Sequence, residues 1–211
     1  QAFLKEKKMV SSILQWTVNV IIEDLENEKL VYVGTDHGVY ASLDYGNKFF
    51  AFSSGLSNSP VHDLVVHPRE RDLVVGTHGR SIYIAGIKHL QMLNEKILIK
   101  NLHFFKVDKV KFNPRWGSRG WGSNYLTPNL ELVFYAKSGG ETEIIIYKDD
   151  EMQKSIDLDA NKGLNFINYD LSVDTKKKST TDNGITYLKK GDYRIEIIQG
   201  ENSSEEKLII N

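Results

Sequence analysis

Short runs of β-branched and aromatic residues, separated by polar turns, follow one another along most of the chain. The runs are bounded by Gly, Asp, Asn or Pro, and this pattern predicts β-strands joined by tight turns. In the first ninety residues we expect a group of four strands and then a group of three. Their expected ranges are 18–23, 30–34, 39–42 and 49–52, followed by 63–66, 73–76 and 82–85.

The two groups of strands are copies of one repeat. The segment "TVNVIIEDLENEKLVYVGTDHGVYAS" aligns with "PVHDLVVHPRERDLVVGTHGRSIYIAG", so that Val18 matches Val61 and Gly34 matches Gly76, at offsets of 43 and 42 residues. A repeat of about 40–45 residues with four antiparallel strands is typical of a β-propeller blade. The sequence therefore predicts about two blades over residues 1–87, fewer than the ~4–8 that close a propeller. We expect either a longer parent protein or a small open sheet that packs on the rest of the chain.

The remaining residues divide into a connecting segment and a second group of strands. In 88–126 the repeat is lost; "KHLQMLNEKIL" predicts a short helix or an irregular connector, and a loop rich in Gly, Asn and Pro follows it. Over 127–211 six or seven short strands alternate with polar turns, which predicts a β-sandwich of the immunoglobulin-like type. The fold class is thus all-β. The expected sandwich core is Leu132, Phe134, Ile144, Ile146, Phe166, Tyr169, Tyr193 and Ile195.

The turn after the third strand carries a recognisable motif. In "SLDYGNKFF", Asp44 can accept hydrogen bonds from the backbone of its own turn, Ser42 can cap that turn, and Gly46 tolerates a positive φ angle. Phe49 can bury its ring against neighbouring strands. This pattern, Ser-x-Asp-x-Gly-x-x-Phe, resembles the Asp-box of sialidase-like propellers with bacterial neuraminidase repeats. We interpret it as a structural fastener, and the resemblance places it on the face away from the catalytic end.

The resemblance also points to a functional face. Residues ~17–90 are similar to the last blades of large secreted propellers that include sortilin-like and xyloglucanase-like members, and the turns between second and third strands of such blades lie at the functional end. In this chain those turns contain Asp36 and His37, then His78 and Arg80. Asp36 is a candidate general acid or base, and Arg80 a candidate ligand for a carboxylate or sugar hydroxyl. The alternative is that these residues only hold their turns.

The sequence offers no complete catalytic site. A glycosidase needs two carboxylates about 5–9.5 Å apart, and Asp36 alone is not a pair. Arg69 and Arg71 fall on the turn between first and second strands, where they cannot join Arg80 in a sialidase-like cluster. No metal-ligand spacing, phosphate-binding glycine loop or cofactor motif is present. The chain has no cysteine, so thiol catalysis and disulfides are excluded.

Two tryptophans in the connecting segment form a second candidate site. Trp116 and Trp121 could provide an aromatic platform for a sugar ring or a peptide, or else a buried clamp between two domains. Beyond them, "KGLNFINYDL" and "LKKGDYRIEI" resemble strands of immunoglobulin-like modules related to the flagellar hook-cap fold. Tyr169 and Lys190 stand where those modules have Trp and Pro, so the resemblance is incomplete. Such modules often follow secreted propellers and sometimes act as surface-attachment tails.

The charge and hydropathy of the chain limit the classes of partner that it is expected to bind. Lys and Arg number 27 against 28 Asp and Glu, a balance that argues against a nucleic-acid-binding surface. The apolar runs are far shorter than the ~20 residues that span a bilayer. The chain begins at Gln1 without an apolar leader, and the partial propeller leads us to expect that the natural N-terminus lies elsewhere.

Together these patterns predict a non-catalytic part of a secreted or surface-attached bacterial propeller protein that binds a glycan or a protein. The alternative is a glycoside hydrolase whose catalytic carboxylates lie in blades missing from this chain, and a third hypothesis places surface attachment in 127–211. We expect no cofactor and no metal. Exposed blade edges predict self-association through strand pairing.

Overall fold

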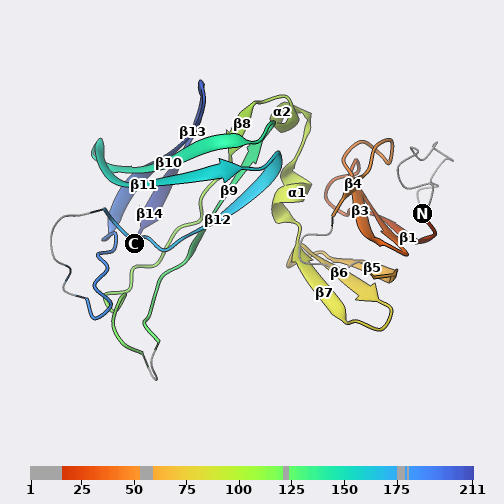
Figure 1. Ribbon diagram of the computed structural model, residues 1–211, viewed down its shortest axis with the longest axis horizontal. Coiled ribbons are helices and arrows are strands. Elements are labelled where there is room, and N and C mark those ends of the chain that lie inside the picture. The colour runs from red at the N-terminus through yellow and green to blue at the C-terminus, as the bar shows by residue number, and fades with distance from the viewer. Residues whose placement is uncertain (1–15, 53–58, 121–123, 175–178, 180) are drawn as a thin grey trace. The chain divides into compact units, whose positions relative to one another are not determined.

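The computed structural model describes residues 16–52, 59–120, 124–174, 179 and 181–211. Over these ranges the chain is almost entirely β-structure, arranged in four open antiparallel sheets, so the all-β prediction is confirmed. The chain divides into two compact units, Gln1–Asn94 and Glu95–Asn211, and each unit contains two of the sheets (Figure 1). Each unit is described by itself below.

The first sheet of unit 1 has four strands in chain order. They are β1 (Val18–Glu23), β2 (Val31–Thr35), β3 (Gly38–Ser42) and β4 (Phe50–Ala51). The second sheet has three, β5 (Val61–His67), β6 (Asp72–Thr77) and β7 (Ile82–Gly86), and a short helix follows, α1 (Lys88–Met92). Each predicted strand of the repeat is present, with bounds that differ by at most two residues, because β-branched runs favour the extended backbone and Gly, Asp and Pro end them.

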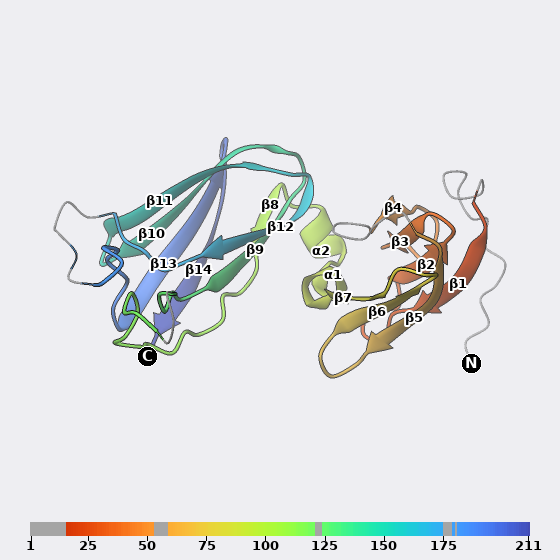
Figure 2. The ribbon, with the colours of Figure 1, turned by 60° about the horizontal axis from the view of Figure 1, so that its bottom comes forward.

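The two sheets of unit 1 pack closely at Gly34, on β2. A Cβ atom placed on this glycine would lie 2.6 Å from Val20 Cγ1 and 2.7 Å from Val61 Cγ1. The strands β1 and β2 of the first sheet therefore meet β5 of the second with no room for a side chain at this point (Figure 2). This face-to-face packing of the two sheets is what the repeat predicts, because each repeat copy forms a sheet that must bury one face against the next copy.

Unit 2 is built from two sheets with a shared core. Its elements are α2 (Glu95–Leu98), β8 (Leu102–Phe104), β9 (Leu130–Ala136), β10 (Gly140–Lys148), β11 (Glu151–Ala160), β12 (Gly163–Tyr169), β13 (Gly191–Gln199) and β14 (Asn202–Ile210). One sheet has the order β12-β9-β8, and the other has the order β11-β10-β13-β14. Strand β8 lies inside the segment 88–126 that the sequence assigned to a linker, and it pairs with β9.

Seven of the eight predicted core residues of unit 2 are buried in one cluster with Leu208 and Ile210. The eighth prediction, Phe166, is wrong: this side chain is 50% exposed. In β12 the inward positions are Asn165, Ile167 and Tyr169, and successive side chains of a strand point to opposite faces. Asn165 occupies a buried position because it accepts the backbone N–H of Asn161 at 2.8 Å and donates to the Asn161 carbonyl at 2.8 Å.

Candidate functional site

The turns between second and third strands of the two repeat copies share one construction. In the first, the Thr35 hydroxyl donates to the Gly38 carbonyl at 3.1 Å and accepts the backbone N–H of His37 at 3.0 Å. In the second, the equivalent Thr77 hydroxyl donates to the Ser81 carbonyl at 2.6 Å and accepts the Ser81 N–H at 3.1 Å. The threonine hydroxyls therefore hold each turn internally.

Both first strands carry a β-bulge beside these turns. In β1, Val18 pairs with Thr35 but Val20 pairs with Gly34, so that Asn19 is an extra residue. In β5 the same shift occurs at the repeat-equivalent position, where the extra residue is His62. A bulge bends the strand and re-aims a side chain, and bulges are frequent next to binding sites. In a regular strand His62 and Asp63 would point to opposite faces, and the bulge at His62 breaks this alternation.

The bulge residues bring the two turns together. The amide nitrogen of Asn19 donates to Asp36 Oδ1 at 3.0 Å and to the carbonyl of Val61 at 3.1 Å. His62 lies against His78, with 5.4 Å between the ring centroids. The backbone N–H of His78 also donates to the Pro60 carbonyl at 2.9 Å. One continuous polar surface therefore contains residues from both repeat copies, and we call it the turn face.

Trp16, which lies beside His37 and Tyr40, extends the turn face on the side of the first sheet. Trp16 lies 4.1 Å from His37, between ring centroids, and 6.0 Å from Tyr40 in an edge-on arrangement. His37, His62 and His78 are exposed to solvent, whereas Asp36 and Trp16 are partly exposed. Arg80 is exposed in the β6–β7 turn. The site residues predicted from the sequence on these two turns thus border one accessible surface.

The carboxyl of Asp36 is stabilised in its charged form. The hydrogen bond from Asn19 lowers the pKa of this carboxyl below its ordinary value, a hydrogen bond from Thr17 acts in the same direction, and the nearby imidazoles of His37 and His62 lower it slightly further. A general acid at neutral pH needs a raised carboxyl pKa, which is the opposite shift. Asp36 is therefore suited to accept hydrogen bonds as a carboxylate.

The residues of the Asp-box form a closed hydrogen-bonded turn at the other end of β3. Ser42 is fully buried; its hydroxyl donates to Asp44 Oδ1 at 2.8 Å and accepts the Gly46 N–H at 2.9 Å. Asp44 Oδ1 also accepts the Lys48 N–H at 2.8 Å, and Gly46 has a φ angle of +80°. Phe49 packs beside the buried Val31 and Val33.

Trp116 does not contribute to an exposed aromatic platform of the kind that the sequence suggested. Trp116 is buried in the core of unit 2, where its ring lies 5.2 Å from Phe112 and 6.3 Å from Tyr187 between centroids. A ring covered in this way cannot stack on a ligand. Trp121 lies outside the described residues.

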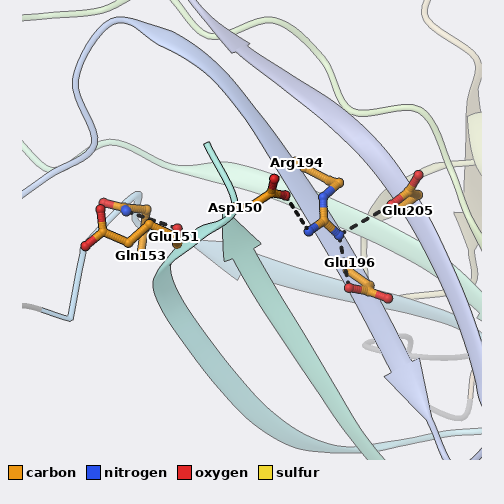
Figure 3. A network of polar contacts seen from close by, with 6 residues as sticks. All are labelled: Asp150, Glu151, Gln153, Arg194, Glu196 and Glu205. Carbon is orange, nitrogen blue, oxygen red and sulfur yellow. Dashed lines mark hydrogen bonds and ion pairs between the residues drawn. The ribbon is translucent and has the colours of Figure 1, made fainter. Parts of the chain in front are cut away.

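Unit 2 carries a charged hollow of about 470 Å³ on the sheet β11-β10-β13-β14. Arg194, on β13, is one of the residues that line it and pairs with Glu196 at 3.1 Å, Glu205 at 3.4 Å and Asp150 at 3.5 Å (Figure 3). Its guanidinium also covers the ring of Tyr147 at 4.2 Å. Because three carboxylates and an aromatic ring already engage this cation, the hollow is a surface network that joins β13 to its neighbours, and the turn face is the better candidate site.

A buried polar network in unit 1 was not foreseen from the sequence. Asp24, between β1 and β2, accepts both hydrogen bonds of the Gln91 amide, at 2.9 and 3.1 Å, and the hydroxyl of Tyr32 at 3.2 Å. Arg71 donates to the Gln91 side-chain oxygen. Burial, reinforced by the charge of Asp24, raises the pKa of Tyr32 well above its ordinary value. The network ties α1 to both sheets and satisfies every charge it buries, so its role is structural.

Sequence reasoning missed Asn19, His62 and Trp16 as members of the turn face. In the repeat alignment Asn19 matches His62. Two polar residues at equivalent positions of otherwise apolar strands could have indicated that both belong to the site. Among the described residues, no group of three His, Cys, Asp or Glu side chains is arranged to hold a metal ion. In the same part of the chain, no helix is both long and apolar enough to cross a membrane.

Comparison with known proteins gives little further information. No protein family and no curated protein matches the chain. Among solved structures, the chain resembles the extracellular domain of a putative one-component system from B. thetaiotaomicron, with 10% sequence identity and a TM-score of 0.29. The match covers 92% of this chain and 25% of that protein, so the chain spans about a quarter of its length. A similarity of this size carries no argument about fold or function.

Proposed function

We propose that the chain is a non-catalytic part of a secreted bacterial β-propeller-like protein and that its turn face binds a glycan. The observation that carries the proposal is the convergence of both repeat copies on one surface through paired bulges, with Asn19 and His62 as the inserted residues. Folds do not determine function, so the argument rests on the groups that this surface presents.

These groups suit a hydroxyl-rich ligand. Asp36 is held as a carboxylate acceptor, the exposed imidazoles of His62 and His78 offer both donors and acceptors, and Arg80 adds a charged donor. Trp16 supplies an aromatic surface beside them. Binding sites for small molecules combine a few convergent polar groups with aromatic side chains in this way.

The surface is less suited to hydrolysis. Glycosidases place two carboxyl groups across the scissile bond, one of them with a raised pKa. On the turn face the carboxyl of Asp36 has its pKa lowered, and its hydrogen-bond partner is the amide of Asn19. A hydrolase in which further blades supply the catalytic carboxylates is the competing proposal.

A glycan array tests the proposal, with the wild-type chain compared with His78→Ala. The matched control is His67→Ala, because His67 is also exposed but lies at the far end of β5, where its ring nitrogen accepts the Glu70 N–H. We expect His78→Ala to weaken binding of the glycans that the wild-type chain binds by about five- to tenfold, since one lost hydrogen bond is worth about 1–1.5 kcal/mol. His67→Ala should bind as the wild type does.

Three results would contradict this account. Equal loss in both histidine variants would mean that the substitutions act through folding, and no retained glycan at any concentration would remove the glycan as ligand. Release of reducing sugar during the same incubation would favour the hydrolase instead.

A further inference from the structure

Three of the six histidines of the chain lie on the turn face. His37 lies in the β2–β3 turn, His62 is the bulge residue of β5, and His78 lies in the β6–β7 turn. The rings of His62 and His78 lie 5.4 Å apart between centroids, with 57° between their planes. Histidine side chains change their charge between about pH 5 and 8, so the charge of this surface depends on pH in that range.

The backbone holds two of these imidazoles side by side. The register shift between Val61 and Asp63 makes His62 the extra residue of β5, and the backbone N–H of His78 donates to the Pro60 carbonyl at 2.9 Å. When both rings are protonated, their positive charges repel each other, and an anion that lies between them removes this repulsion. The pair therefore couples the binding of an anion to the uptake of protons.

Protonation reverses the sign of the charge on the turn face. Among the described residues, the other charged groups at this end of the two sheets are Asp36, Asp63 and Arg80. With neutral imidazoles, one cation stands against two carboxylates, a formal charge of −1; with three protonated imidazoles, four cations stand against two carboxylates, a charge of +2. Both carboxylates are already engaged, since Asp36 accepts the Asn19 amide at 3.0 Å and Asp63 accepts the Leu64 N–H at 3.0 Å.

We propose that the turn face takes a negatively charged group of its glycan, a carboxylate or a sulfate ester, between His62 and His78, and that this binding requires proton uptake. The inference rests on the proposed function and adds the regulation of the same site, because the glycan is held in mildly acidic medium and released as the pH rises. Protonated imidazoles donate charge-assisted hydrogen bonds to the oxyanion, and Arg80, two residues after His78, adds a charge that does not depend on pH. Asp36 accepts hydroxyl groups of the same sugar.

Isothermal titration calorimetry with matched oligosaccharides tests the coupling. The ligands are a uronic-acid oligosaccharide, a sulfated one, and the neutral form of each, so that the two sources of the anion are distinguished. We expect the dissociation constant of at least one acidic ligand to rise by about tenfold or more between about pH 5.5 and 8, within the roughly 5–150-fold range of such couplings. The neutral forms should bind more weakly, with little dependence on pH.

Glutamine variants assign the effect to the histidine pair. Glutamine keeps an N–H donor but cannot take up a proton, so His62→Gln and His78→Gln should each reduce the pH dependence toward that of the neutral ligands. The matched control is His67→Gln, at the far end of β5, which should keep the dependence of the wild type. Full pH dependence in both variants of the pair would overturn the inference.

Sodium sulfate is the probe that separates this inference from glycan binding. At about pH 5.5 it should shift the imidazole NMR signals of His62 and His78, and at about pH 8 it should not, with sodium chloride at equal ionic strength as the control. A sulfate response without binding of any glycan would support the anion site and remove the glycan as its ligand. Equal affinity for acidic and neutral glycans at both pH values would overturn the anion site and leave glycan binding in place.

Discussion

Replacement of Gly34 by alanine probes the packing of the two repeat sheets. The new Cβ would lie 2.6 Å from a methyl group of Val20 and 2.7 Å from one of Val61, distances at which these valine side chains or their strands must move. Gly76 is the repeat-equivalent glycine and provides a matched control. There the new Cβ would lie 3.5 Å from the Cβ of Asp63, which is an ordinary contact.

The magnitudes follow from these distances. Overpacking a tight interior costs about 1–3 kcal/mol, whereas Gly→Ala stabilises a compatible position by about 0.4–1 kcal/mol through the unfolded chain. We therefore expect Gly34→Ala to destabilise unit 1 by about 1–2 kcal/mol and Gly76→Ala to be neutral or slightly stabilising.

Native-state hydrogen exchange is the suitable assay, because the chain has two units and a single unfolding transition cannot be assumed. Gly34→Ala should accelerate the exchange of the most protected amides of β2 and β5 by about tenfold, since 1.4 kcal/mol is a factor of ten. Amides of β10 and β13, in unit 2, serve as an internal reference and should be unchanged. Equal exchange in the two alanine variants would refute the close packing of the sheets at Gly34.

Three further predictions concern single side chains. Ser42→Ala removes a buried hydroxyl that bonds Asp44 and the Gly46 N–H, so it should lower the opening free energy of the β3 amides in native-state hydrogen exchange by about 1–3 kcal/mol without changing glycan binding; unchanged protection would remove the fastener role. Asn19→Ala should raise the pKa of Asp36 toward its ordinary value in a carboxyl NMR titration. Since a lowered carboxyl pKa stabilises the fold above the unfolded-state pKa and this stability is lost as pH falls through the folded-state pKa, the variant should also lose less stability in acid, and an unshifted titration would contradict the assigned hydrogen bond. Phe134→Ala should cost about 3–5 kcal/mol in hydrogen exchange of the protected amides of β9 and β10, and Phe166→Ala much less, because only the first ring is buried; similar losses would contradict the outward position of Phe166 on β12.

The strands were predictable from the sequence because local chemistry determines them. β-Branched runs favour extended backbone, and the turns around Ser42 and Thr35 are closed by hydrogen bonds from residues a few positions away. The repeat then indicated which strands belong to one sheet. The positions of Asp36 and His78 on equivalent turns followed from that alignment.

Other features depend on contacts that the sequence pattern does not reveal. A bulge shifts a register by one residue without changing the run of apolar side chains, so neither Asn19 nor His62 was identified as a site residue. The predicted burial of Phe166 was wrong because the polar Asn165 beside it occupies the inward position, which its hydrogen bonds to Asn161 make favourable. The pairing of Asp24 with Gln91 joins residues 67 positions apart.

The central claim is that the turn face, and not the hollow around Arg194, binds the ligand. It is tested most directly by NMR titration of the uniformly labelled chain with a glycan retained on the array, with the indole N–H of Trp16 and the imidazole signals of His62 and His78 followed. We predict that these signals shift together with one dissociation constant, while amides of β13 around Arg194 stay in place. Shifts confined to β13 and its neighbours would contradict the account and assign the binding surface to unit 2.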